Sequence, residues 1–264
     1  LCTPNSQHES QVLEALEAGK EVFCEKPLAL SRKGAERMIE TAAAKGRVLG
    51  VGHERRFEPP MEEIARLVDT GELGTLLHVE ANWSHDLLVG LDPASWRVSP
   101  AEGPSIGMTG MGVHMTDLMI AMLGPVEAVS ARRADRVLGF QTGDMTALHL
   151  RFRSGATGFL AAAVATPYYC RYGLFGDRMW AEARDSGHPQ HGGETYLTVC
   201  GKDGVQKNRR FDARDSARAN LEEWAAAIEG EGRYRFSAEE LVGNIALLEA
   251  VGRSAENDGA WADL

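Results

Sequence analysis

Lys26 is the first residue whose type and position could do chemistry. It follows the apolar run 22–24, which predicts a short buried strand, and it precedes Pro27. Because a proline keeps the preceding residue out of the helical region, we expect Lys26 to lie extended at the carboxyl end of that strand. Ligands of open α/β sheets bind at that end, so Lys26 is a candidate for proton transfer. The alternative is a solvated lysine beside a turn.

His114 and Asp117 form the second candidate group. They are the strongly polar residues of the stretch 113–123, which is otherwise apolar and therefore predicts a buried helix. A spacing of three residues puts both on one helix face, where a histidine beside a carboxylate could relay a proton or act as an acid/base. A hydrogen-bonded pair of the core is an equal alternative. A metal site is less favoured, because two ligands on one helix do not make a site.

Trp96 and Arg97 lie next to each other in a predicted loop that contains Asp92-Pro93. An aromatic ring beside a guanidinium suits stacking on a planar cofactor and pairing with an anionic or hydroxylated ligand. The alternative is a tryptophan that anchors the loop beside a solvated arginine. His188 and His191 belong to the loop-like segment 184–194, where we expect them to be exposed to solvent.

The elements that must position these residues divide the chain in two. Up to residue 73 helices alternate with short strands, a pattern typical of a parallel sheet covered by helices. After Gly74 consecutive strands with hairpin-length turns predict an antiparallel sheet, and two helices follow them. The expected helices cover residues 5–18, 31–46, 59–71, 113–123, 216–229 and 237–254. The expected strands cover residues 22–24, 47–52, 76–84, 126–138, 144–153, 156–164, 168–175, 178–183, 194–200 and 205–211.

Composition restricts the possible partners. The 264 residues carry a net charge of -10, from 28 basic and 38 acidic side chains, which disfavours nucleic acid and anionic membranes as partners. No run approaches the 18 apolar residues that predict a membrane span. The four cysteines show no close spacing, so we expect reduced thiols in a cytoplasmic protein rather than disulfides or a zinc site.

Five segments together resemble the Gfo/Idh/MocA family of nicotinamide-dependent oxidoreductases, in the family's order and spacing and over essentially the whole chain. They are Thr3-Pro4-Asn5-Ser6-Gln7-His8, residues 18–28 with Glu25-Lys26-Pro27, Trp96-Arg97, residues 112–118 with His114, and residues 236–240. The resemblance implies an α/β protein: part of a Rossmann domain with a parallel sheet over residues 1–73, then an α+β substrate and oligomerisation domain over residues 74–264. The second domain would have a large, mainly antiparallel sheet, and the last helix would pack back on the first domain.

The resemblance also implies function. The cofactor would be NAD or NADP, the substrate a sugar, a cyclitol or a related small molecule, and the assembly a homo-oligomer formed through the open face of the second sheet. Lys26 would be the acid/base with His114 as its partner, and the substrate would contact Lys26, Arg97 and His114. No metal is implied. The residues expected to line the cofactor are Thr3, Pro4, Asn5, His8, Glu25, Lys26, Trp96 and Arg97.

Two departures from the family pattern matter. The sequence contains no Gly-x-Gly-x-x-Gly, and the family's opening β-α-β-α-β, roughly 60–70 residues, is absent from it. We therefore expect the chain as written to hold the nicotinamide half of the cofactor site without the adenosine half. Gly110 stands four residues before His114, where many dehydrogenases of the family carry Asp. A non-catalytic, ligand-sensing or regulatory relative is the alternative function.

Overall fold

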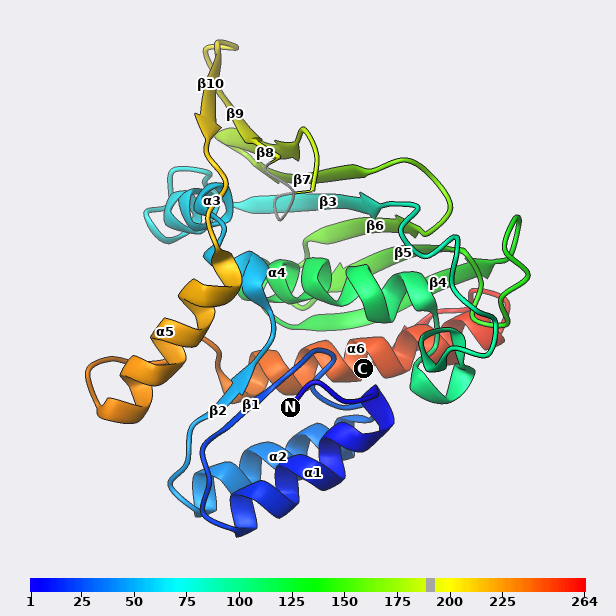
Figure 1. Ribbon diagram of the computed structural model, residues 1–264. Coiled ribbons are helices and arrows are strands. Elements are labelled where there is room, and N and C mark those ends of the chain that lie inside the picture. The colour runs from blue at the N-terminus through cyan, green and yellow to red at the C-terminus, as the bar shows by residue number, and fades with distance from the viewer. Residues whose placement is uncertain (189–192) are drawn as a thin grey trace.

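The computed structural model describes residues 1–188 and 193–264. Its N-terminal part consists of helices α1 (Asn5–Glu17) and α2 (Arg32–Ala44) beside two short parallel strands, β1 (Val22–Cys24) and β2 (Leu49–Val51) (Figure 1). The Ser31 side chain accepts a hydrogen bond from the Gly34 amide at the start of α2, as a helix cap should. Helix α1 has no such side-chain cap, because its N-cap residue is Pro4, and the Asn5 side-chain amide donates to the Glu102 carbonyl.

A nine-stranded sheet forms the larger part of the molecule. Strand β3 (Leu76–Ser84) lies in its middle, antiparallel to β7 on one side and parallel to β6 on the other. All other pairs are antiparallel, in the order β10-β9-β8-β7-β3-β6-β5-β4-β11, so the predicted mainly antiparallel sheet is confirmed. The remaining strands are β4 (Val126–Ala134), β5 (Met145–Phe152), β6 (Thr157–Ala163), β7 (Tyr169–Gly176), β8 (Met179–Asp185), β9 (Thr195–Gly201), β10 (Gln206–Phe211) and β11 (Ala262–Asp263).

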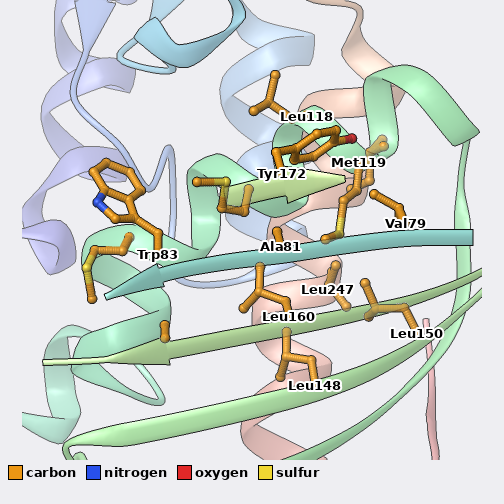
Figure 2. Close-up of a cluster of buried hydrophobic side chains, with 14 of the residues drawn as sticks. Val79, Ala81, Trp83, Leu118, Met119, Leu148, Leu150, Leu160, Tyr172 and Leu247 are labelled. Carbon is orange, nitrogen blue, oxygen red and sulfur yellow. The ribbon is translucent and has the colours of Figure 1, made fainter. Parts of the chain in front are cut away.

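Helices α4 (Val113–Leu123) and α6 (Ala238–Glu256) cover one face of this sheet (Figure 1). Figure 2 shows the resulting core, where Leu148 and Leu160 of the strands lie with Leu118 of α4 and Leu247 of α6. Alternate residues of β5 and β6 point into this core, as the two-residue period of a strand requires. Within the described residues, no helix is both long enough and apolar enough to cross a membrane.

Short helical turns connect the two parts. They are η1 (Glu54–Phe57), which leads from β2 into α3 (Pro59–Asp69), η2 (Trp96–Val98), η3 (Pro100–Glu102) and the π-helix η4 (Met108–Gly112). The π-helix runs directly into α4. Such π-helical turns are frequent at functional sites, and both η1 and η4 contribute to the site described below.

The C-terminal segment returns to the N-terminal part. Helix α5 (Ser216–Glu229) and the beginning of α6 share a second hydrophobic cluster with α1, α2, β1 and β2. The Tyr234 hydroxyl donates to Asn220 Oδ1 at 2.7 Å, and the Asn220 amide donates to the Val51 carbonyl at 2.8 Å. Two separate segments of the C-terminal half therefore complete the core around β1 and β2.

Candidate active site

The Lys26 side chain extends from the end of β1 to the π-helix. Its ammonium donates a hydrogen bond to the Gly110 carbonyl at 2.7 Å, across 84 residues of sequence. The peptide bond between Lys26 and Pro27 is cis. Burial lowers the pKa of Lys26 below its ordinary value, while the carboxylates of Glu54 and Glu25 partly oppose that shift. An amine with a lowered pKa can exchange protons closer to neutral pH than an ordinary lysine.

Lys26 borders a cavity of about 420 Å³ between the two parts of the chain. The guanidinium of Arg97 stacks on the Trp96 ring at 4.4 Å from its centroid. One aromatic ring among hydroxyl, amide and charged groups is the mixture that a planar, hydroxylated ligand requires. The lining residues are Cys2, Thr3, Asn5, Glu25, Lys26, His85, Leu88, Trp96, Arg97, Ile106, Thr109 and Gly110.

Pro4 and His8 were expected to line this cavity but are not among its lining residues. His8 is fully buried, and its Nδ1 and Nε2 lie 2.8 Å and 3.0 Å from the carbonyl oxygens of Pro27 and Thr3. Its ring therefore joins the loop after β1 to the start of α1. His8 therefore supports the Thr3 and Lys26 segments through backbone groups, and a role of Pro4 and His8 at the cofactor stays a prediction.

His114 lies on α4 and is 2 % exposed. Among the described residues its Nδ1 has no hydrogen-bond partner, and it lies 3.6 Å from Glu54 Oε2. The rings of His53 and Trp83 are each 5.4 Å from the imidazole, centroid to centroid. Burial and the positive charge of Lys26 hold the pKa of His114 well below its usual range, so the imidazole is neutral near pH 7.

Asp117 does not pair with His114. Its carboxylate accepts two hydrogen bonds from Arg56, from Nε at 2.7 Å and from Nη2 at 2.6 Å. A second carboxylate, that of Glu240, binds the same guanidinium at 3.0 Å. A fork of guanidinium donors matches a carboxylate better than a single imidazole nitrogen does, and Arg56 reaches Asp117 from η1. The histidine–aspartate pair suggested by the helix spacing is therefore replaced by an arginine–aspartate pair.

Sequence patterns did not single out the residues of η1 that complete the site. His53, Glu54 and Arg55 follow β2 as Lys26 follows β1, and the carboxyl ends of parallel strands meet at one edge of a sheet. The guanidinium of Arg55 lies 3.8 Å from the centroid of the Trp83 ring and binds Glu58 at 3.1 Å. A charged run directly after the second parallel strand was the available signal.

A second cavity, of about 330 Å³, opens on the Glu54 side of the site. Trp83 Nε1 and Arg55 Nε beside it are buried donors without a hydrogen-bond partner in the described structure. Buried donors of this kind are rare in folded proteins and call for an acceptor. The cavity is lined by Glu54, Arg55, Glu58, Trp83, His188 and residues 213–217.

Of the two candidate histidines in the segment 184–194, the structure describes His188 only. His188 lines the second cavity, and its ring lies 6.3 Å from that of Trp83. His191 lies outside the described residues. Among the residues that are described, no three His, Cys, Asp or Glu side chains gather as a metal site requires.

The arrangement suits proton transfer between an amine and a small polar molecule. Lys26 borders one cavity, Glu54 borders the other, and His114 lies near Glu54. Burial keeps bulk water from the imidazole and strengthens the electrostatic interactions among the three groups. Such a site can take up or release a proton while a second molecule reacts beside it.

Two protein-family models match the chain. The model described as "Oxidoreductase family, NAD-binding Rossmann fold" covers residues 1–53, and "GFO/IDH/MocA C-terminal domain" covers residues 61–182. The chain is 31% identical over 262 residues to "D-xylose 1-dehydrogenase (NADP(+)) 2" of Haloferax volcanii, covering 97% of this chain and 77% of that protein. It is 30% identical over 267 residues to "Inositol 2-dehydrogenase 4" of Saccharopolyspora erythraea, covering 98% and 74%.

Solved structures share the fold. An aldose-aldose oxidoreductase from Caulobacter crescentus, complexed with glycerol, has a TM-score of 0.85 at 25% identity, covering 99% of this chain and 77% of that one. An inositol dehydrogenase homologue from Azotobacter vinelandii, complexed with NAD+, has a TM-score of 0.86 at 24% identity, covering 100% and 77%.

Proposed function

Because the chain belongs to the Gfo/Idh/MocA family of oxidoreductases, we propose that Lys26 serves as acid/base for hydride transfer between NAD or NADP and a small substrate. The substrate would be a sugar, a cyclitol or a related molecule that reacts at a hydroxyl or carbonyl group. One observation carries the proposal: Lys26, with its lowered pKa, borders the cavity that Trp96 and Arg97 also line.

The lining of that cavity suits a nicotinamide riboside. Thr3, Asn5 and Glu25 offer hydroxyl, amide and carboxylate groups for a ribose, and Trp96 with Arg97 offers a face for a planar ring. The bound cofactor would accept the hydride when an alcohol is oxidised. Gly110 contributes its carbonyl and no side chain, so the lining there leaves room for the reacting part of the substrate.

Lys26 handles the proton of the reaction. In the direction of oxidation the neutral amine accepts the hydroxyl proton and becomes an ammonium ion, which the Gly110 carbonyl can bind. In the direction of reduction the ammonium returns that proton to the carbonyl oxygen of the substrate. His114, neutral and buried beside Glu54, would contact the substrate next to the reacting group without competing for the proton.

A panel of sugars and cyclitols tests the function. The chain is incubated with each compound and NAD+ or NADP+, and the appearance of reduced cofactor is followed by absorbance; the reverse reaction is run with the matching carbonyl compounds. Turnover with at least one member supports the proposal. No turnover in either direction, with ligand binding still measured by calorimetry, would instead favour a sensing or regulatory role, for which Gly110 in place of an acid is the supporting observation.

The open face of the large sheet supports the expected homo-oligomer. Phe159 is 48% exposed in the middle of that face and contacts His149 and His78, at 4.7 Å and 5.1 Å between ring centroids. Trp261, 43% exposed, contacts His149 of β5, and Phe175 of β7 contacts His78 of β3. These rings together form an aromatic stripe across the open face. We propose that two copies meet through this aromatic stripe, since exposed apolar patches of this kind mark interfaces.

Replacement of Phe159 by Asp is expected to convert the oligomer to a monomer. A charge in the centre of an aromatic contact costs an interface about 2 kcal/mol or more, which weakens association roughly 30-fold. Size-exclusion chromatography with light scattering measures the mass. Val137→Asp, in the exposed turn after β4, is the matched control and should leave the mass unchanged. A monomeric parent chain, or an F159D variant of unchanged mass, contradicts the proposed interface.

The cysteines support a cytoplasmic location. Cys24, Cys170 and Cys200 are buried and unpaired, and burial raises the pKa of the Cys24 thiol to about 12. Buried reduced thiols are typical of proteins in reducing compartments. We propose on this basis that the protein acts in the cytoplasm.

A further inference from the structure

Two basic side chains share the centre of the site. The ammonium of Lys26 reaches the Gly110 carbonyl, and Nδ1 of the His114 imidazole has no hydrogen-bond partner among the described residues. Within the same residues, neither group forms a hydrogen-bonded ion pair. Buried charges in proteins are normally balanced by an opposite charge, so the site requires a carboxylate close to both.

Most nearby carboxylates are bound to other groups. Asp117 accepts two hydrogen bonds from Arg56, and Glu58 binds Arg55. Glu25 turns its Oε2 to the Lys26 backbone amide at 3.2 Å and also borders Gly52. Position 110 has no side chain at all, although a Cβ built there would meet nothing within 4 Å.

Glu54 is placed to balance both basic groups. Its Oε2 lies 3.6 Å from His114 Nδ1, and among described carboxylates it alone lies within 4.0 Å of that imidazole. Its negative charge also opposes the lowering of the Lys26 pKa by burial. The side chain follows β2 and borders the second cavity.

We propose that Glu54 is the positioning residue of the site, supplying the negative charge that Lys26 and His114 share. The catalytic part of this proposal rests on the proposed function. When Lys26 accepts the hydroxyl proton it gains a positive charge, and the carboxylate of Glu54 stabilises that charge. The same carboxylate favours the proton of the neutral imidazole on Nδ1, which leaves Nε2 free to accept a hydrogen bond.

The charges around Lys26 and Glu54 come from every packed element. Glu25 and Lys26 extend from β1, Arg55 shares η1 with Glu54, Arg97 extends from η2, and His53 precedes η1. Burial raises the pKa of Glu54, whereas Lys26 lowers it; for Lys26 burial lowers the pKa and Glu54 raises it. Removal of the Glu54 charge must therefore lower the pKa of Lys26 further.

Titration of Lys26 tests the proposal without cofactor or turnover. The rate of acetylation of Lys26 is measured against pH by peptide mass spectrometry in the parent chain and in Glu54→Gln. We expect the midpoint to fall by roughly one pH unit in E54Q, as for the loss of a close opposite charge. Glu63→Gln, which removes one exposed carboxylate of α3, is the matched control and should leave the midpoint in place. Coincident titrations of E54Q and the parent overturn the proposal.

Two further variants separate charge from packing. Glu54→Asp keeps the carboxylate, so its acetylation midpoint should stay close to that of the parent. A purely structural role for the longer glutamate side chain would not explain that result. Gly110→Asp in the E54Q background returns a carboxylate to the open space beside Lys26 and should raise the midpoint again. If neither variant restores the midpoint, the charge of Glu54 is not what sets it.

Turnover provides the final measurement. In E54Q the rate of oxidation should fall about tenfold, the equivalent of one pKa unit. The acid limb of its pH–rate profile should also move to lower pH, because the Lys26 amine then stays neutral to lower pH. An unmoved acid limb in E54Q contradicts the positioning role. A parent without turnover defeats the proposed function alone, since the acetylation midpoint still decides whether Glu54 balances Lys26.

Discussion

Replacement of Lys26 by methionine is expected to lower oxidation of the substrate by about 10²- to 10⁴-fold, the usual contribution of a positioned acid/base. Methionine keeps the length and apolar stem of lysine but cannot accept a proton. The Gly110 carbonyl would lose its hydrogen-bond donor, and the cavity lined by Trp96 and Arg97 would remain. The binding of NAD(P)H, followed by protein fluorescence, should therefore change far less than turnover.

The pH dependence of the parent follows from the same side chain. Oxidation requires the neutral amine, which predominates above the pKa of Lys26, so its rate should rise with pH through that value. Reduction requires the ammonium ion and should fall over the same range. Because burial lowers that pKa, both limbs should lie below the ordinary range of lysine. Lys20→Met is the control on an exposed lysine; a K26M variant with parental turnover would refute the role of Lys26.

Replacement of Asp117 by leucine is expected to lower the free energy of unfolding by about 3–5 kcal/mol. The change leaves Arg56 buried with the partly exposed Glu240 as its remaining ion-pair partner, so a positive charge is only partly balanced in the core. Urea denaturation followed by circular dichroism measures the loss. The large cost comes from the unpaired charge and not from the side-chain volume.

The double variant Arg56→Met/Asp117→Leu distinguishes those two causes. With both charges gone, the stability should recover most of what the single Asp117→Leu change loses, because a buried ion pair contributes little beyond an apolar pair of similar size. Arg56 also stacks on Phe236, at 4.3 Å from the ring centroid, and methionine can keep that contact. A double variant that is less stable than the single one would show that Arg56 stabilises the fold through contacts other than Asp117, such as Glu240 and Phe236.

Local patterns predicted the elements well. The Ser31 cap, the strand 76–84 and the helix 113–123 all lie where their residue types require them. Strand order was beyond reach, because β3 pairs with β6 some 79 residues later and turn residues report only on adjacent strands. The division at residue 73 stays a prediction; the second hydrophobic cluster adds residues 219–245 to the N-terminal side.

The site was predictable only in part. Lys26, Trp96 and Arg97 could be found because each belongs to a recognisable short motif, and the structure brings them to one cavity. Glu54 could not, since a charged run after a strand looks the same as a solvated loop. The partner of Asp117 lies 61 residues away on another element, and spacing within one helix cannot reveal it.

Because α5 and α6 pack against the N-terminal part, that part can finish folding only after both helices have been synthesised. A ribosome that has released residues 1–213 has made Lys26, His114 and every strand of the large sheet except β11. It has not yet made Asn220 or Tyr234, which bind the Val51 carbonyl. The core around β1 and β2, the strands that precede Lys26 and Glu54, is therefore completed only by residues from the last fifth of this chain. Until then the growing chain holds Lys26 beside an incomplete hydrophobic core, so the segment around Lys26 can reach its final packing only after nearly all of the chain has been translated.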